Sequence, residues 1–204
     1  MSSTRLYGIG LLCSLLTIAT GFPQQDESTS LEKCRSVLAA DLTDAKAPAF
    51  GAYSTTTPEA FQTAALDLKS NPIARAYRTT LREQMSEKPN FAGYYRLAYW
   101  GCGASCAMFA VVNLKTGKVI TAKEFTTVVG THLYANDFLP GTLSDSWGFR
   151  YKIDSSLLVV LGAPDEDEAR AGAYYFALQG DKLHLLHTTY ASKRHCDPRL
   201  IKHP

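Results

Sequence analysis

The chain has 204 residues, of which 46% are hydrophobic, and 21 Lys and Arg against 19 Asp and Glu give a formal net charge of +2 at pH 7. This length is typical of one domain with a sizeable core. The near-neutral charge, without a cluster of Lys and Arg, argues against a nucleic-acid partner and against electrostatic membrane binding.

The first 21 residues have the pattern of an export signal. Arg5 supplies a positive charge, residues 6–20 form an apolar run that is short for a bilayer span, and Ala19 and Gly21 are small residues at the positions that a signal peptidase reads. We expect cleavage after Gly21 and export to the bacterial periplasm or secretion, with no transmembrane segment in the mature chain. Two alternatives remain open: lipid attachment at Cys13, and an uncleaved membrane anchor.

Start signals and apolar spacing predict helices in the first part of the mature chain. A flexible polar leader, residues 22–30, precedes a single globular domain, residues 31–204. Thr57 and Asn71 each stand before a Pro, the residue favoured at the first helical position, and apolar residues then recur at helical spacing. The expected helices span residues 31–40, 58–68 and 72–87.

From Phe91 onward the apolar residues alternate with a period of two, and Val, Tyr, Phe and Thr become frequent, as is typical of strands. Short turns connect the strands, which indicates an antiparallel meander. The predicted fold is α+β, with N-terminal helices packed on a curled antiparallel β-meander of about seven strands. The expected strands span residues 91–101, 106–113, 118–125, 149–153, 157–162, 172–178 and 182–190.

Four cysteines remain after the expected cleavage, an even number in an exported chain, and they allow three pairings. We favour a local bond between Cys102 and Cys106 and a long-range bond between Cys34 and Cys196. The loop-entropy model gives the local bond about 2 kcal/mol and the long one about 5 kcal/mol.

Four motifs cover the strand region: FAGxY at 91–95, WGCGxxC at 100–106, TGKV at 116–119 and DSxLLVVxG at 154–162. Together they resemble a group of exported bacterial proteins without an assigned function, over roughly residues 89–190. The family often has His where Tyr94 stands here, so a role that rests on that His does not carry over. The resemblance implies a bacterial, exported setting and the sheet, and it implies no activity.

A hydrolase or a thiol-dependent enzyme is the alternative function. The segment from Gly103 to Ala107 is similar to the nucleophile elbow G-x-S-x-G, with Ser105 at the nucleophile position. However, Ala107 replaces the second glycine, and the segment would join two strands instead of a strand and a helix. His132 is the candidate base for Ser105 or for the thiols of Cys102 and Cys106.

The sequence predicts no metal site and no cofactor. The acidic run at 165–168 lacks the spaced ligand pattern of a calcium loop. His184 and His187 are three residues apart in an expected strand, so they should point to opposite faces of the sheet.

The leading hypothesis is a non-catalytic binding or inhibitor-like module for an unknown protein, peptide or glycan partner. Alternation places Tyr94, Arg96 and Trp100 on one face of the first strand, where aromatic rings beside an Arg would bind a partner if that face is open. If helices cover the face, the same residues are packing. The long connection at 127–147 is a second candidate region. The candidate surface consists of Tyr94, Arg96, Trp100, Gly101, Gly103, Ser105 and His132.

Overall fold

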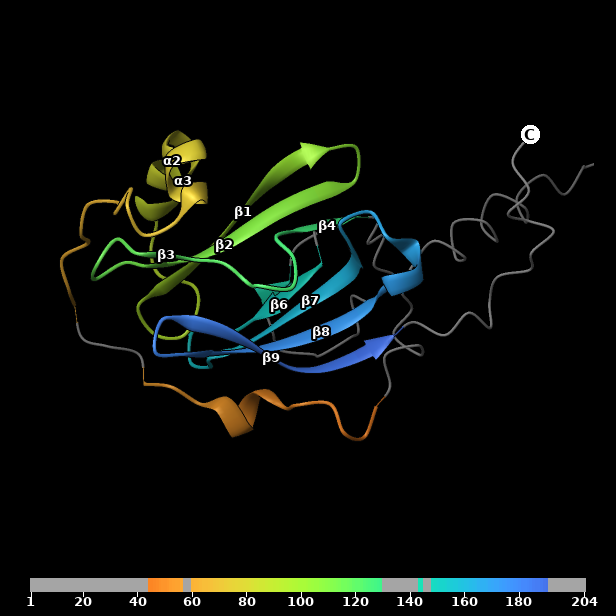
Figure 1. Cartoon of the computed structure of the whole chain (residues 1–204). Helices are drawn as coiled ribbons and strands as arrows, with labels where there is room; N and C mark the ends of the chain where they lie inside the picture. Colours follow the sequence, from red (N-terminus) through yellow and green to blue (C-terminus); the bar gives the residue numbers. More distant parts are fainter. Residues whose placement is uncertain (1–43, 57–59, 130–142, 145–147, 191–204) are drawn as a thin grey trace, which may run out of the picture.

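The computed structural model describes residues 44–56, 60–129, 143–144 and 148–190 (Figure 1). The expected signal, leader and first helix lie outside the described residues. Cys34, Cys196 and His132 lie outside them as well. None of the described helices has the length and hydropathy needed to cross a membrane.

Strands make up most of the regular structure, and all their pairings are antiparallel. Runs of apolar and β-branched residues favour this conformation. The strands are β1 (Tyr95–Gly103), β2 (Cys106–Asn113), β3 (Val119–Ile120), β4 (Thr127–Val129), β5 (Leu143–Ser144), β6 (Phe149–Tyr151), β7 (Leu157–Pro164), β8 (Gly172–Gln179) and β9 (Lys182–Tyr190).

The strand order departs from a plain meander at β4. One edge of β2 pairs with β1, and its other edge pairs with β3 near one end and with β4 near the other. β4 also pairs with the end of β7, so this three-residue strand joins the β1–β3 half to the β5–β9 half. Within the second half, each strand pairs with the next one in sequence.

The predicted α+β class is wrong, because the described residues form mainly an antiparallel sheet with only two short α-helices, α2 (Pro72–Ala76) and α3 (Arg78–Met85). The expected helix at 58–68 is absent from its described part, residues 60–68. Instead, the backbone N–H of Ala64 donates to Leu114 O at 2.8 Å and that of Asp67 donates to Gly117 O at 2.9 Å. These donors are then unavailable to a helix, since an i to i−4 bond would need the same N–H groups.

The expected helix at 72–87 is split in two. Asn71 caps its start, because its side chain accepts a hydrogen bond from the N–H of Ile73 at 2.9 Å. Tyr77, with φ −113° and ψ 31°, separates α2 from α3. The buried side chains Leu81 and Met85 of α3 contact apolar residues of β1, β2 and β3. Two short helices cover one corner of the sheet and do not form a layer over it (Figure 1).

The main core lies between the two halves of the sheet. Aromatic rings from both halves meet there: Phe125 lies 4.8 Å from Tyr174 and Phe109 lies 5.4 Å from Phe149, centroid to centroid. The outer face of β7 and β8 is covered in turn by Phe50, in a short 3-10 helix, η2 (Phe50–Tyr53). Consequently every residue of β7 is buried. Every residue of β2 is buried too, because its second face packs against the side chains of α2 and α3. Each large apolar side chain buried in this way contributes about 1.5–3 kcal/mol.

Candidate functional site

The tip of the β1–β2 hairpin is an exposed loop with a constrained shape. Residues 101–105 are all exposed, whereas Cys106 is only 7% exposed. A two-residue turn joins the paired residues Gly103 and Cys106, and the register shift at Cys102 makes that residue a bulge. Gly103 has φ +148° and Ser105 has φ +53°, as tight hairpin turns require. The backbone at the tip therefore adopts the conformation of a tight two-residue turn.

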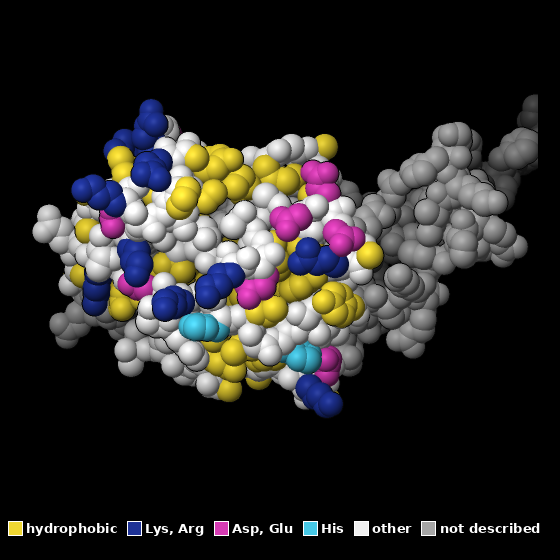
Figure 2. Space-filling model, viewed as in Figure 1, with side chains coloured by type: hydrophobic (Ala, Val, Ile, Leu, Met, Phe, Trp, Pro, Cys, Tyr) yellow, Lys and Arg dark blue, Asp and Glu magenta, His cyan; other side chains and the backbone are white. Residues whose placement is uncertain are grey.

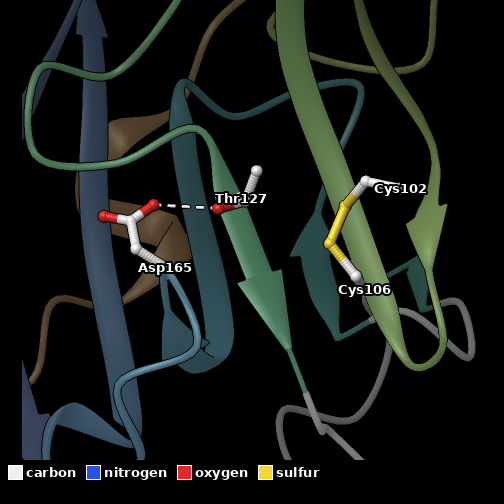
Figure 3. The surroundings of a disulfide bond; sticks show 4 residues. All are labelled: Cys102, Cys106, Thr127 and Asp165. Carbon is white, nitrogen blue, oxygen red and sulfur yellow. Dashed lines mark hydrogen bonds between the residues drawn. A yellow bond between two sulfur atoms is a disulfide. The ribbon is translucent and has the colours of Figure 1, made fainter.

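A disulfide bond between Cys102 and Cys106 closes this tip, with the two Cα atoms 5.1 Å apart (Figure 3). This is the local pairing that the sequence favoured. Cys106 pairs with Val129 of β4, and the hydroxyl of Thr127 on the same strand donates to Asp165 Oδ1 at 2.8 Å. The disulfide thus links the exposed tip of the hairpin to Cys106 of β2, and β2 is itself paired with β4.

We expect peptide mapping without reductant to recover Cys102 and Cys106 in one disulfide-linked species. Replacing both with Ser should lower the free energy of unfolding by about 2 kcal/mol, because the bond closes a short loop in the unfolded chain. Urea denaturation of the oxidised protein and of the C102S/C106S variant measures the difference. A freely alkylatable Cys102 in the untreated protein would contradict the bond.

The rest of the candidate surface on β1 is engaged in packing. The ring of Trp100 lies 4.9 Å from that of Tyr77, centroid to centroid. Arg96 donates to Lys88 O at 2.8 Å and forms an ion pair with Glu87, and its side chain is only 12% exposed. Arg96 and Trp100 therefore serve in packing, which is the alternative for a face covered by helices.

Tyr94 is also surrounded by its own chain. Its ring stacks on Tyr95 at 4.5 Å and meets Phe61 edge-on at 6.3 Å. Lys115 Nζ lies 4.2 Å from the centroid of the Tyr94 ring, within cation–π range. These contacts make Tyr94 part of an internal aromatic cluster, so Tyr94, Arg96 and Trp100 do not form one open stacking surface.

A polar cluster that the sequence analysis missed lies around Asp181, in the turn between β8 and β9. Asp181 Oδ1 accepts hydrogen bonds from Tyr95 OH at 2.7 Å and from Asn113 Nδ2 at 2.9 Å. Lys118 Nζ lies 3.7 Å from Asp181 Oδ2. The cluster joins the β8–β9 turn to β1 and to the β2–β3 hairpin, and each of its polar groups has a partner within it.

The charge of Asp181 is stabilised by these neighbours. Partial burial alone would raise the pKa of its carboxyl, but the hydrogen bonds from Tyr95 and Asn113 and the charge of Lys118 outweigh burial and hold that pKa below its ordinary value. The pKa of Tyr95 is raised, chiefly by burial and also by its contacts with Tyr94 and Asp181. Tyr95 is therefore a neutral donor and Asp181 a charged acceptor.

His184 and His187 share one face of the sheet, contrary to expectation. A register shift opposite Tyr175 and Phe176 inserts Leu186 as an extra residue in β9, so His184 pairs with Ala177 and His187 with Tyr175. His187 Nε2 lies 2.7 Å from Asp44 Oδ2. The pair ties the first described residues, at the start of the segment 44–56, to β9.

Ser105 is exposed in the hairpin turn, and its positive φ follows from that turn between two strands. A nucleophile elbow instead joins a strand to a helix. The proposed base, His132, lies outside the described residues. No described contact therefore favours the hydrolase or thiol-enzyme alternative.

The acidic run follows β7, and Asp165, Glu166 and Asp167 are exposed. Among the residues that the structure describes, no group of three or more His, Cys, Asp or Glu side chains is arranged to hold a metal ion. The described contacts of Asp165 are with the chain itself, through Thr127.

Comparisons with known proteins return no relative. No protein-family model matches the chain, and the searches found no matching curated protein and no matching solved structure.

Proposed function

We propose that the protein is a non-catalytic binding module of the bacterial periplasm or envelope and that it binds a protein or peptide partner through the β1–β2 tip, residues 101–105. The export-signal pattern and the motif resemblance support the exported setting. The observation that carries the proposal is the combination of full exposure at 101–105 with a disulfide that closes the loop.

A closed tip suits binding for two physical reasons. A loop that is already ordered loses less conformational entropy on association than a flexible one, so more of the contact energy remains as affinity. The tip lies at the end of the β1–β2 hairpin that is away from α2 and α3 (Figure 1), and its residues 101–105 are exposed, so a partner can reach it. Gly101 and Gly103 leave its backbone groups accessible, because they have no side chains to cover them.

Capture from an envelope extract tests the tip directly. The immobilised wild-type protein and the Ala104→Arg variant are compared with Gln179→Arg, which adds the same charge at an exposed residue of β8. We expect one partner to be recovered by the wild type and by Gln179→Arg, and at least tenfold less of it by Ala104→Arg. A buried contact in the centre of an interface can cost about 2 kcal/mol or more when altered, which exceeds a tenfold change.

The C102S/C106S variant serves as a second comparison. Its tip keeps nearly the same surface chemistry but loses the covalent constraint, so it should recover less partner than the wild type. Equal recovery by the wild type and Ala104→Arg would contradict the proposal, and so would the absence of any partner that depends on the tip.

A further inference from the structure

Three arginines lie on α2 and α3. Arg75, Arg78 and Arg82 are all exposed, and each follows directly after a residue that packs against the sheet. Arg78 and Arg82 are four residues apart in α3, so they share one flank of that helix. Arg75 lies in α2, and it is likewise exposed directly after a buried residue. None of the three forms a salt bridge with a described residue. Their charges are therefore available to an external anion.

Further cations surround these arginines at the same end of the molecule. Ser70 Oγ accepts from Val119 N, which brings Lys69 beside the β2–β3 turn and Lys118. Figure 2 shows Lys and Arg side chains gathered over α2, α3 and the β2–β3 region. We call this region, formed by α2, α3 and the β2–β3 and β8–β9 turns, the basic end. Its Lys and Arg residues are Lys69, Arg75, Arg78, Arg82, Lys88, Arg96, Lys115, Lys118 and Lys182.

The acids of the basic end are fewer than its nine Lys and Arg, and they are Asp67, Glu83, Glu87 and Asp181. Glu87 pairs with Arg96, and Asp181 pairs with Lys118. Three consecutive exposed acids, Asp165 to Asp167, lie elsewhere, after β7. Figure 2 shows acidic side chains toward the right of the molecule, and others among the Lys and Arg at the left. Opposite charges are thus partly separated across a molecule whose net charge is close to zero, and the field near its surface depends on this separation.

We propose that the basic end binds the anionic lipid headgroups of a bilayer surface. This reverses the expectation from the sequence, because the fold brings together Lys and Arg residues that are dispersed along the chain. Guanidinium groups donate pairs of hydrogen bonds to phosphate oxygens and are more weakly hydrated than ammonium groups. A negative surface repels the acidic residues Asp165 to Asp167, so the same charge separation orients the protein with α2 and α3 toward the lipid. An exported protein meets membrane surfaces, whereas nucleic acid is confined to the cytoplasm, so the expected export favours a lipid over a nucleic acid as the anion. The surface is separate from the β1–β2 tip, which stays free for a partner.

The test measures binding of the chain from Phe22 onward, the form left by the expected cleavage, to two kinds of vesicle. One contains phosphatidylcholine alone and the other contains phosphatidylcholine mixed with phosphatidylglycerol. We expect co-sedimentation with the mixed vesicles only, and a decrease as salt is added. The R75Q/R78Q/R82Q variant should bind the mixed vesicles about a hundredfold more weakly, since each basic residue near an anionic surface contributes about fivefold.

The control variant K46Q/K123Q/R170Q changes the net charge equally but leaves the basic end intact. It should bind the mixed vesicles almost as well as the wild type, and circular dichroism confirms that both variants are folded. Equal losses in the two variants would overturn the proposal, as would equal binding to the two kinds of vesicle. Tighter binding of the wild type to a random-sequence DNA duplex than to the mixed vesicles would overturn it too.

Discussion

The Asp181→Ala variant is expected to unfold with a free energy about 3 kcal/mol smaller than that of the wild type. The carboxylate of Asp181 accepts hydrogen bonds from the hydroxyl of Tyr95 and the side-chain amide of Asn113. Tyr95 and Asn113 are only 8% and 4% exposed. A buried polar group that loses its partner costs about 1–3 kcal/mol. Ala is also disfavoured at this position, because Asp181 has φ +57°. Urea denaturation of the two proteins measures the loss.

Two further variants separate these causes. Asp181→Gly removes the carboxylate but tolerates the positive φ, so it should lose about 2 kcal/mol, the share of the hydrogen bonds alone. Asp154→Ala removes an exposed acid from another hairpin and should change the free energy by no more than about 0.5 kcal/mol. If Asp181→Gly matched the wild type, the cluster would not stabilise the fold.

The contribution of Asp181 should also depend on pH. Its pKa in the folded protein is held below 3.8, the value for an unperturbed Asp. The carboxyl of Asp181 therefore binds a proton more readily in the unfolded chain than in the folded protein. The stabilisation by its charge is complete above the pKa that Asp181 has in the unfolded chain, and it is lost as the pH falls through the lower pKa of the folded protein. The difference in unfolding free energy between the wild type and Asp181→Gly should be larger at about pH 6 than at about pH 3. An unchanged difference would show that the carboxylate charge plays no part.

The long strands were predictable because each carries its own signal. The ranges expected for 106–113 and 182–190 coincide with β2, which is almost entirely apolar, and with β9, which is rich in Leu, Thr and Tyr. β4 and β5 have only three and two residues, too few to show any period. Since β4 joins the two halves of the sheet, the topology depends on a strand that is too short to be recognised from the sequence.

The helix prediction at 58–68 failed because the spacing of apolar residues does not show where the backbone N–H groups of the segment form their hydrogen bonds. Phe61 and Leu66 do pack against the apolar cluster beneath α2 and α3, as apolar residues on one side of a segment should. The backbone reaches that cluster in an extended form, held by hydrogen bonds to Leu114 and Gly117. Tertiary pairing outweighs a helix propensity that is worth only a few tenths of a kcal/mol per residue.

The candidate site was predictable only where its parts are close in sequence. Cysteine number and expected compartment pointed to the bond between Cys102 and Cys106, which are four residues apart. The hydrogen-bond partners of Asp181 are 68 and 86 residues away in the chain, so no local pattern in the sequence indicates this cluster. The bulge at Leu186 likewise depends on pairing with β8, and it alone puts His184 and His187 on one face.

The Gly117→Ala variant is expected to lose about 3 kcal/mol of unfolding free energy, from two effects. Gly117 has φ +75°, where Ala costs about 1–2 kcal/mol. In addition, a Cβ at this position would lie 1.8 Å from the carbonyl oxygen of Ala65, so the extended segment must move away. That movement breaks the hydrogen bonds of Ala64 and Asp67 to the β2–β3 hairpin, each worth about 1 kcal/mol.

The Gly180→Ala variant isolates the first effect. Gly180 has φ +51°, and a Cβ there would meet nothing within 4 Å, so its loss should be about 1 kcal/mol. Hydrogen exchange locates the second effect, since the amide of Ala64 should lose protection in Gly117→Ala and keep it in Gly180→Ala. Equal losses in the two variants, with Ala64 protected in both, would mean that the extended segment does not rest on the turn. In that case the positive φ of Gly117 would be the whole reason for a glycine in this turn. A larger loss in Gly117→Ala than in Gly180→Ala, by contrast, requires the close packing of residues 64–67 against Gly117.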